Sequence, residues 1–592
     1  MPRRASGRRL PSQVLVETGT AEVREENLLQ MTVDGWKVLL EWKGPGKPAG
    51  SIERCEGTTL VHFDLPKGPL GEYHISVQQP FIDIHRSWSG SVDCWRGSEL
   101  TSIALNFSFN TAANFNLPVI CNYARTGENR GVIGLIDHVT ATLVNQRPLI
   151  EEPPMHLLQT RFSRQRRTGG FRETVVLCRE KRHFVEAIRR VMKLCRQRQG
   201  IKPLPAPDWA RDPVWCSWYS HLYGLTQRQV EEQIPHLKRL GVRTVLLDAS
   251  WFKKPHEAYH RKSGDYRAEL SLFPDLPGLS RRLHSEGLKL MLWCVPHFVG
   301  VHSRKRRAMG AYCVRDGKAR SYQLCPFCDE SKAYARALVE RVMREYELDG
   351  LKLDFLDQFG PACADPAHNH GDGNFGAAVT EFMRAVRDGI LHVNPAAAIE
   401  YRISYSTLAT LPFANCHRGN DAPYDADYMR RENLFLRLFC DYPSAIWNDY
   451  AYWHALEKPE NISLMLGQQI FSGGVPTLSI NLAQCGQAQR RIIGRWLEFY
   501  RRSRDTLARA ELSVHSADSS FSDSSLQNVE KGDAFVLLAG QHVPAKINLQ
   551  PGIRRAWVLN AGAEKGGEMS LVSGKSETRL RLTQRGPVLA SL

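Results

Sequence analysis

A lysine and an aspartate interrupt the apolar segment GLKLDFL, which otherwise has the composition of a buried strand. Burying an isolated charge is very costly unless the charge is paired or takes part in chemistry. Successive side chains of a strand point to opposite faces, so Lys352 and Asp354 share one face and the apolar residues share the other. Lys352 then offsets the charge of Asp354 and keeps that carboxylate ionised. Buried ion pairs are weak stabilisers, so the pattern favours catalysis, with a structural ion pair as the alternative.

Polar and aromatic side chains also occur at the ends of other strand-like segments. They are Asp248 and Trp251 in TVLLDASWF, Trp293 in LMLWCVP, Glu400 and Arg402 in IEYRISY, Arg418, Asp421 and Asp425 in HRGNDAPYDAD, and Trp447 and Asp449 in IWNDYAYW. Each has a plainer explanation; Asp425, for example, could cap the helix that follows it. Carboxylates together with indole rings suit a sugar, because its C–H face packs on an aromatic ring while its hydroxyls bond to charged groups.

The segments that carry these residues alternate between strand-like and helical patterns over residues 201–510. About eight such units in about 300 residues are what an α/β fold of the (β/α)8 TIM barrel type requires. Enzymes with this fold keep their chemistry at the C-terminal ends of the barrel strands, which is where these polar residues occur. The sequence therefore predicts a catalytic barrel with Lys352 and Asp354 pointing to its interior.

Two β-rich regions flank this barrel. Residues 1–200 contain short alternating runs such as WKVLLEW and SIALNFSFN, separated by Gly, Pro and Asn turns, and end in a helical segment. This pattern predicts an N-terminal β-sandwich domain. Residues 511–592 return to β runs such as DAFVLLAG, which predicts a small C-terminal antiparallel β-sandwich.

Composition is that of a soluble globular protein, with 42% hydrophobic and 24% charged residues. No apolar run approaches the roughly 20 residues of a membrane helix, and the first 30 residues lack the apolar core of a secretory signal. The 14 cysteines lie mostly in apolar segments, as reduced thiols do. Basic clusters at residues 1–9, 161–167 and 302–310 account for much of the net charge of +16, but no nucleic-acid module accompanies them. We expect a cytoplasmic protein that binds neither membrane nor nucleic acid.

Taken in order, the motifs TVLLDASWF, LMLWCVP, DGLKLDF and HRGNDAPYDAD resemble the α-galactosidases of glycoside hydrolase family 36 and their clan relatives. The resemblance covers residues 205–510 well, and the flanks match that family's N-terminal supersandwich and small C-terminal β domain in pattern only. It implies that Asp354 is the nucleophile and that Asp421, three residues after Arg418, is the acid/base. It further implies that the terminal sugar is lined by three residues, Asp248, Lys352 and Trp293.

Position and chemistry assign the remaining candidates to substrate binding: Trp251, Glu400, Arg402, Arg418 and Asp425. The implied reaction is hydrolysis, with retention, of a terminal α-galactosyl or related α-glycosyl bond in a small oligosaccharide or glycoconjugate. Alternatives are a transglycosidase like the raffinose synthases, an α-N-acetylgalactosaminidase, and a non-catalytic sugar-binding protein. The chain departs from the family at Ala249, where a second aspartate is usual, and at His297, where many members have an acidic residue. The sequence leaves a homo-oligomer possible.

Two segments have the residue types of a metal or redox site. They are CPFC, with Cys325 and Cys328, and the loop CADPAHNHGDG, with Cys363, Asp365, His368, His370 and Asp372. CPFC has no partner pair for zinc and opens a helix instead of belonging to a thioredoxin unit. The loop directly follows the strand of Asp354, where barrel loops line the active site. We therefore expect a polar loop facing substrate, with neither a metal nor another cofactor.

Overall fold

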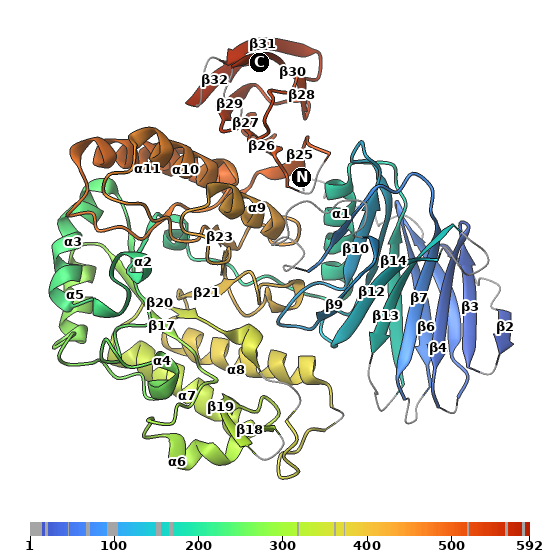
Figure 1. The fold of residues 1–592 in the computed structure, drawn as a ribbon, viewed down its shortest axis with the longest axis horizontal. Helices are drawn as coiled ribbons and strands as arrows, with labels where there is room; N and C mark the ends of the chain where they lie inside the picture. The colour runs from blue at the N-terminus through green and yellow to red at the C-terminus, as the bar shows by residue number, and fades with distance from the viewer. Residues whose placement is uncertain are drawn as a thin grey trace, which may run out of the picture.

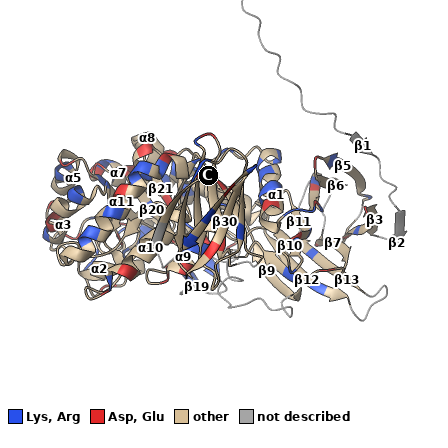
Figure 2. Ribbon diagram, turned by 90° about the horizontal axis from the view of Figure 1, so that it is seen from above, with Lys and Arg blue, Asp and Glu red and all other residues tan. Residues whose placement is uncertain are grey.

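The protein has three parts in the computed structural model, which describes residues 15–17, 22–25, 27–44, 46–66, 71–91, 105–149, 156–164, 170–316, 319–359, 363–371, 373–517, 520–562, 566–582 and 586–592. A barrel and an N-terminal pair of β-sheets lie side by side, and a small C-terminal β domain lies above them in the view of Figure 1. Of the basic clusters seen in the sequence, residues 1–9 and 165–167 lie outside the described residues. Elsewhere Lys and Arg are interspersed with Asp and Glu over all three parts (Figure 2).

The barrel consists of eight parallel strands. In sheet order they are β23 (Ala445–Trp447), β22 (Cys416–Arg418), β21 (Ala398–Arg402), β20 (Gly350–Leu353), β17 (Lys289–Cys294), β16 (Thr244–Leu247), β15 (Val214–Cys216) and β24 (Thr477–Leu478). Parallel bridges from Trp447 to Val475 and from Ala451 to Leu478 join the two ends of this order. The sheet is thereby closed, which confirms the predicted (β/α)8 barrel.

Helices cover the outside of the barrel. They are α3 (Gln227–Leu240), α5 (Leu276–Ser285), α7 (Asp329–Glu345), α8 (Phe375–Val393), α9 (Ala426–Leu436), α10 (Pro459–Phe471) and α11 (Gln487–Ala508). Their apolar residues recur at helical spacing; in α8 the buried positions include 379, 382, 383, 386 and 390, which form one face. Among the described residues, β21 differs from the other strands because only the short 3-10 helix η7 (Leu408–Thr410) follows it.

The strand register aligns the predicted site residues. Trp293 of β17 lies opposite Lys352 of β20, which in turn lies opposite Glu400 of β21. Two residues further along, Arg402 lies opposite Arg418 of β22. Because the strands are parallel, these side chains all reach the same end of the barrel.

The N-terminal part is a sandwich of two antiparallel seven-stranded sheets. One contains β1 (Leu15–Glu17), β5 (Ala49–Cys55), β6 (Thr58–Leu65), β14 (Phe171–Cys178), β11 (Asn129–Leu135), β10 (Val119–Tyr123) and β8 (Arg86–Ser89). The other contains β2 (Glu22–Glu25), β3 (Leu28–Val33), β4 (Trp36–Trp42), β7 (Tyr73–Pro80), β13 (Leu157–Arg164), β12 (Thr142–Leu149) and β9 (Phe107–Thr111). Their inward-facing residues form a core of their own, and α1 (Phe184–Arg198) follows the last strand.

The C-terminal part has two small sheets around a third core. One sheet contains β25 (Glu511–Val514), β26 (Asp523–Asn528), β27 (Asp533–Leu538), β29 (Arg555–Asn560) and β32 (Gly586–Ser591), and the other contains β28 (Lys546–Leu549), β30 (Gly567–Ser573) and β31 (Ser576–Leu582). The prediction that this part is antiparallel is wrong for two ladders, because β27 pairs with β29, and β28 with β30, in parallel. In each pair one intervening strand joins the other sheet, so the chain returns in the same direction.

The predicted part boundaries at residues 200 and 511 lie after α1 and at the start of β25. Hydrogen bonds from side chains join the neighbouring parts across both boundaries. Asn114 of the sandwich donates from Nδ2 to the Leu356 carbonyl (2.8 Å), and Arg430 of α9 donates from Nη1 to the Phe521 carbonyl (2.6 Å). The Leu356 contact holds the chain two residues after Asp354, so the sandwich supports the site. Among the described helices, none is both long and apolar enough to cross a bilayer.

Two arginines of the sandwich make ion pairs that differ in burial. Arg164 is 1% exposed and bonds through Nη1 to Glu173 (2.6 Å) and Asp137 (3.0 Å), whereas Arg172 is 58% exposed and bonds through Nε to Asp64 (2.7 Å). Removing one partner of a buried pair leaves an uncompensated charge, so Arg164→Met should lower the free energy of unfolding by about 3–5 kcal/mol. Arg172→Met should lower it by less than about 1 kcal/mol. Urea unfolding of both variants measures the difference, and equal losses would contradict this account.

Candidate active site

Asp354 lies directly after β20 and is held by donors from β17, from β21 and the segment that follows it, and from the backbone of the next residue. Trp293 donates from Nε1 to Oδ2 (3.0 Å), while Oδ1 accepts from the Tyr405 hydroxyl (3.2 Å) and from the Phe355 N–H (2.8 Å). Arg402 places Nε 3.1 Å from the same Oδ1. Burial alone would raise the pKa of Asp354, but the charge of Arg402 and the other cations outweighs it and lowers that pKa to about 2. Asp354 is therefore an ionised carboxylate at neutral pH.

Phe355 fixes the direction of the chain after Asp354. Its φ of +57° is in the left-handed region, which costs a non-glycine residue about 1–3 kcal/mol and is concentrated at functional sites. The ring stacks on Tyr259 (5.5 Å between centroids), and the Arg402 guanidinium lies 5.4 Å from its centre. These contacts hold the strained turn in place.

Lys352 bonds to a different aspartate from the one predicted. Its Nζ donates to Oδ2 of Asp248 (2.7 Å), and both side chains are buried. Burial alone would lower the pKa of Lys352, but the charge of Asp248 outweighs it and raises that pKa. The ammonium group also faces the ring of Tyr450, 4.7 Å from its centre. Lys352 acts on Asp354 through its charge, which helps to lower the Asp354 pKa, and not through an ion pair.

Arg418 joins carboxylates from three neighbouring strands. Its side chain is 1% exposed; Nε donates to Glu400 (2.8 Å), and Nη1 donates to Asp449 (2.7 Å) and Asp421 (3.1 Å). The Tyr450 hydroxyl donates to both oxygens of Glu400 (2.8 and 2.7 Å). Glu400 is thus occupied on both sides by protein groups, which makes it a support for Arg418 and Tyr450.

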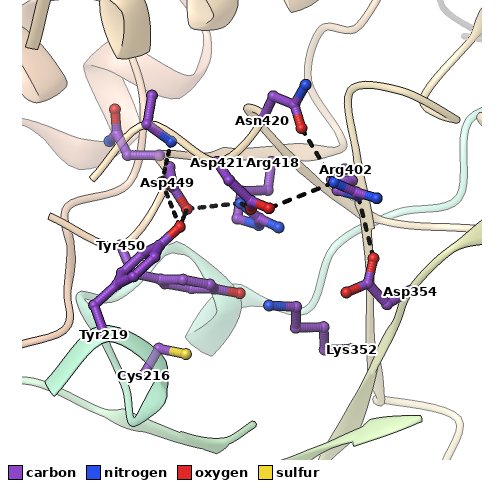
Figure 3. Close-up of polar contacts among 12 residues, drawn as sticks. Cys216, Tyr219, Lys352, Asp354, Arg402, Arg418, Asn420, Asp421, Asp449 and Tyr450 are labelled. Atoms are coloured by element: carbon purple, nitrogen blue, oxygen red, sulfur yellow. Dashed lines mark hydrogen bonds and ion pairs between the residues drawn. The ribbon is translucent and has the colours of Figure 1, made fainter. Parts of the chain in front are cut away.

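Arg402 lies between Asp354 and Asp421 (Figure 3). Its Nε is 3.1 Å from Asp354 Oδ1, its Nη1 is 3.5 Å from Asp421 Oδ2, and Nη1 also donates to Asn420 (3.2 Å). Both carboxylates therefore lie within the reach of one guanidinium group.

Asp421 and Asp449 share Arg418 but differ in environment. The Asp421 side chain is 56% exposed, and Arg418 and Arg402 overcome the effect of burial and lower its pKa. Asp449 is buried and accepts a hydrogen bond from the Tyr219 hydroxyl (3.0 Å). Burial and the charge of Asp421 raise the pKa of Asp449 to about 6, although the charge of Arg418 acts in the opposite direction. Asp449 therefore retains its proton up to about pH 6, and the charge of each carboxylate affects the titration of the other.

Two predicted substrate-binding residues lie apart from this cluster. Trp251 is completely buried, donates from Nε1 to the Trp293 carbonyl (3.1 Å), and packs against Tyr346 at the end of α7. It therefore supports β17 from the helix side. Asp425 accepts from the N–H of Tyr428 (2.9 Å) as the N-cap of α9, which is the plainer explanation that its spacing allowed.

Three tyrosines of the cluster were not singled out from the sequence: Tyr219, Tyr405 and Tyr450. Tyr450 directly follows Asp449 in the IWNDY segment, and Tyr405 ends the IEYRISY segment, so both were within the motifs considered. A tyrosine in such a run equally suits core packing, and only the folded structure shows that its hydroxyl reaches a carboxylate.

His297 is buried against Phe359 (4.3 Å between ring centroids), and burial lowers its pKa to about 3, so it is neutral.

The assembled cluster offers one strongly ionised carboxylate, Asp354, and one exposed carboxylate, Asp421, that is linked to a titratable partner. Two carboxyl groups of unequal proton affinity facing a common space are the arrangement that cleaves glycosidic bonds. Among the described residues, the side chains that contact these two carboxylates are two arginines, a tyrosine and a tryptophan, which suit sugar hydroxyls.

Known structures share this fold. An α-galactosidase of glycoside hydrolase family 36 from Geobacillus stearothermophilus, solved with raffinose, superimposes with a TM-score of 0.66 over 98% of this chain and 87% of that one, at 12% identity. The α-galactosidase from Lactobacillus brevis gives a TM-score of 0.61 over 98% and 85%, also at 12% identity. One from Thermus thermophilus, solved with p-nitrophenyl α-D-galactopyranoside, gives 0.53 over 80% and 94%, at 18% identity.

Sequence similarity is narrower. An A type blood α-D-galactosamine galactosaminidase from Flavonifractor plautii is 28% identical over 191 residues, which are 29% of this chain and only 17% of that protein's length. No family model matches the chain. The chain has the fold of the family 36 α-galactosidases across all three of its parts, as its motifs predict.

Proposed function

We propose that this protein is a retaining glycoside hydrolase that releases terminal α-galactosyl or closely related α-glycosyl residues. The observation that carries the proposal is the pair Asp354 and Asp421, which face one guanidinium at the C-terminal ends of β20 and β22. The shared fold and the name of the similar galactosaminidase support the class of sugar.

In the proposed mechanism Asp354 attacks the anomeric carbon. Its low pKa keeps it ionised, and its bonds to Trp293 and Tyr405 fix its direction. Asp421 protonates the leaving oxygen and later deprotonates the water that hydrolyses the glycosyl-enzyme. A substrate that enters between the two carboxylates displaces part of the Arg402 contact to Asp421. Losing that cation raises the pKa of Asp421, as its role as an acid requires.

Replacing each aspartate by alanine separates the two roles. Asp354→Ala should reduce turnover of every α-glycoside by about 10⁴-fold or more, because no intermediate forms. Asp421→Ala should reduce hydrolysis of a disaccharide by about 10²–10⁴-fold, yet still react with an aryl glycoside whose phenol leaves without help. Added azide should rescue Asp421→Ala with an α-glycosyl azide and Asp354→Ala with the β-anomer, read by NMR. The same anomer from both variants would contradict the assignment.

The proton on Asp449 predicts the pH profile. In the proposed mechanism this proton, which Asp449 holds up to about pH 6, supplies the neighbouring acid Asp421, so kcat/KM for a disaccharide should fall about tenfold per pH unit above that value. Asp354 stays ionised throughout, so kcat/KM for an aryl glycoside with an acidic phenol should stay flat over the same range. Asp449→Asn removes the neighbouring negative charge, which should shift the disaccharide profile to lower pH. Identical profiles for both substrates would exclude this pair as the acid.

Ala249 predicts relaxed or altered sugar specificity. It follows Asp248 and donates only its N–H to that carboxylate (2.8 Å), where a second aspartate would supply another acceptor for sugar hydroxyls. Aryl α-glycosides of galactose, galactosamine, N-acetylgalactosamine and glucose should therefore differ by less than about 10²-fold in kcat/KM, or the amino sugars should be preferred. A preference for plain galactose by several orders of magnitude would show that another group replaces the missing aspartate. Analysis of the products formed when a sugar acceptor is added distinguishes hydrolysis, which gives free sugar, from transglycosylation, which gives a new glycoside.

A further inference from the structure

Two loops that are distant in sequence bring thiols and imidazoles together outside the active-site cluster. Cys325 comes from the segment before α7, and Cys363, His368 and His370 come from the segment between β20 and α8. One sulfur or nitrogen atom of each lies within 4.8 Å of those of the other three. Three of these residues are buried and His370 is half-buried.

We propose that these four residues, hereafter the Cys–His cluster, bind one zinc ion or a similar transition metal ion. Zinc prefers four thiolate and imidazole ligands in a tetrahedron, with Zn–S and Zn–N distances that place neighbouring ligand atoms roughly 3.3–3.8 Å apart. The Cys363 sulfur lies 3.2 Å from His368 Nδ1, and no two of the four atoms are more than 4.8 Å apart, which exceeds the edges of such a tetrahedron by at most about 1.5 Å. Small side-chain rotations would complete the geometry.

Hydrogen bonds prepare two of the ligands. His368 Nε2 lies 2.8 Å from the Ala311 carbonyl, which only accepts, so Nε2 carries the proton and Nδ1 directs its lone pair toward Cys363. A carbonyl that fixes the tautomer in this way is the usual outer partner of a metal-bound histidine. The Arg315 N–H lies 3.3 Å from the Cys363 sulfur and donates to it, which stabilises a thiolate.

His370 gives an independent sign of a missing ligand. Its Nε2 is buried and has no hydrogen-bond partner among the described residues, while its ring packs against the edge of Phe327 (5.1 Å between centroids). A buried polar atom without a partner is costly and uncommon in folded proteins. A metal ion within the Cys–His cluster satisfies this side chain.

The two cysteines of the CPFC segment are thereby given different roles. Cys325 belongs to the cluster, while Cys328 occupies the N-cap position of α7 and packs beside Cys325 in the same small core. Asp365, which the sequence grouped with the same loop, instead pairs with Arg320 (2.6 Å). Asp372 lies outside the described residues. Cys325 of CPFC thus has partner residues that its sequence spacing does not reveal, and the proposal gives the loop a role in metal binding.

The metal ion would be structural. Four protein ligands leave no open position for water or substrate. The cluster connects the loop after β20 to the end of a hairpin formed by β18 (Cys313–Asp316) and β19 (Ala319–Leu324). The same loop already bonds to this hairpin, because the Ala364 N–H donates to the Arg315 carbonyl (2.9 Å). Two loops at the mouth of the barrel are held together in this way.

Metal analysis of purified protein tests the proposal without reference to activity. Wild-type chain expressed with zinc and purified without chelator should contain about one zinc per chain by inductively coupled plasma mass spectrometry. The double variant Cys363→Ser/His370→Ala should contain less than about a tenth of that. The matched control Cys485→Ser/His392→Ala, which replaces a buried cysteine and an exposed histidine elsewhere, should keep the full content.

A second measurement uses wild-type protein, so it tests the proposal even where the double variant fails to fold. Wild-type protein in which the metal is exchanged for Co²⁺ should show the absorption of a tetrahedral cobalt site with thiolate ligands, and alkylating its thiols should release one metal ion per chain. Reduced wild-type protein that holds no metal and takes up neither Zn²⁺ nor Co²⁺ overturns the proposal. So does a Cys325–Cys328 disulfide found by mass spectrometry in freshly prepared protein. Equal metal loss in the control variant would also overturn it.

Discussion

The buried guanidinium of Arg418 is the group on which the mouth of the barrel depends. At 1% exposure it has lost its water and must be neutralised by the protein, and carboxylates from the two flanking strands and from its own loop do so. Its planar fork allows Glu400 and Asp449 to bond on different nitrogens, which a lysine could not do in the same geometry. Each of these carboxylates in turn fixes a tyrosine, so the constraint extends around the barrel.

The charges of the cluster do not balance, and the imbalance bears on chemistry. Six carboxylates, Asp248, Asp354, Asp357, Glu400, Asp421 and Asp449, face three cations, Lys352, Arg402 and Arg418. A surplus of buried negative charge favours retention of a proton, and the pKa of about 6 places it on the most deeply buried aspartate, Asp449. Asp354, bonded to an arginine and a tryptophan, is the carboxylate least able to take it. The division between an ionised and a proton-holding carboxylate thus follows from which cations each one contacts.

The sequence predicted the barrel and most of this site because the polar residues interrupt apolar strands at a fixed period. Asp354, Lys352 and Glu400 stand out by that alternation alone. Ion pairs between side chains of different strands could not be predicted from the sequence. Lys352 was therefore matched with Asp354, its neighbour in the sequence, although it bonds to Asp248 after β16, two strands away in the sheet. Trp251 was misplaced because a tryptophan near a strand end suits a sugar platform and a helix-facing core equally well.

The sequence names both segments of the Cys–His cluster but does not join them. These segments, at residues 325 and 363–370, are brought together only by the folding of α7 and β20 between them. Considered separately, neither supplies all four residues. Sequence spacing reveals a metal site when the ligands lie on one short segment, and it fails when two barrel loops converge.

The central claim is that Asp354 forms a covalent bond to the sugar. Trapping with a 2-deoxy-2-fluoro-α-galactosyl donor that has a good leaving group tests it most directly, because fluorine slows hydrolysis of the intermediate. After proteolysis, mass spectrometry should find one glycosyl group per chain on the peptide that contains Asp354, and none in Asp354→Ala. A label on Asp421 or Asp449, or an active enzyme that is inhibited without any covalent label, would contradict the account.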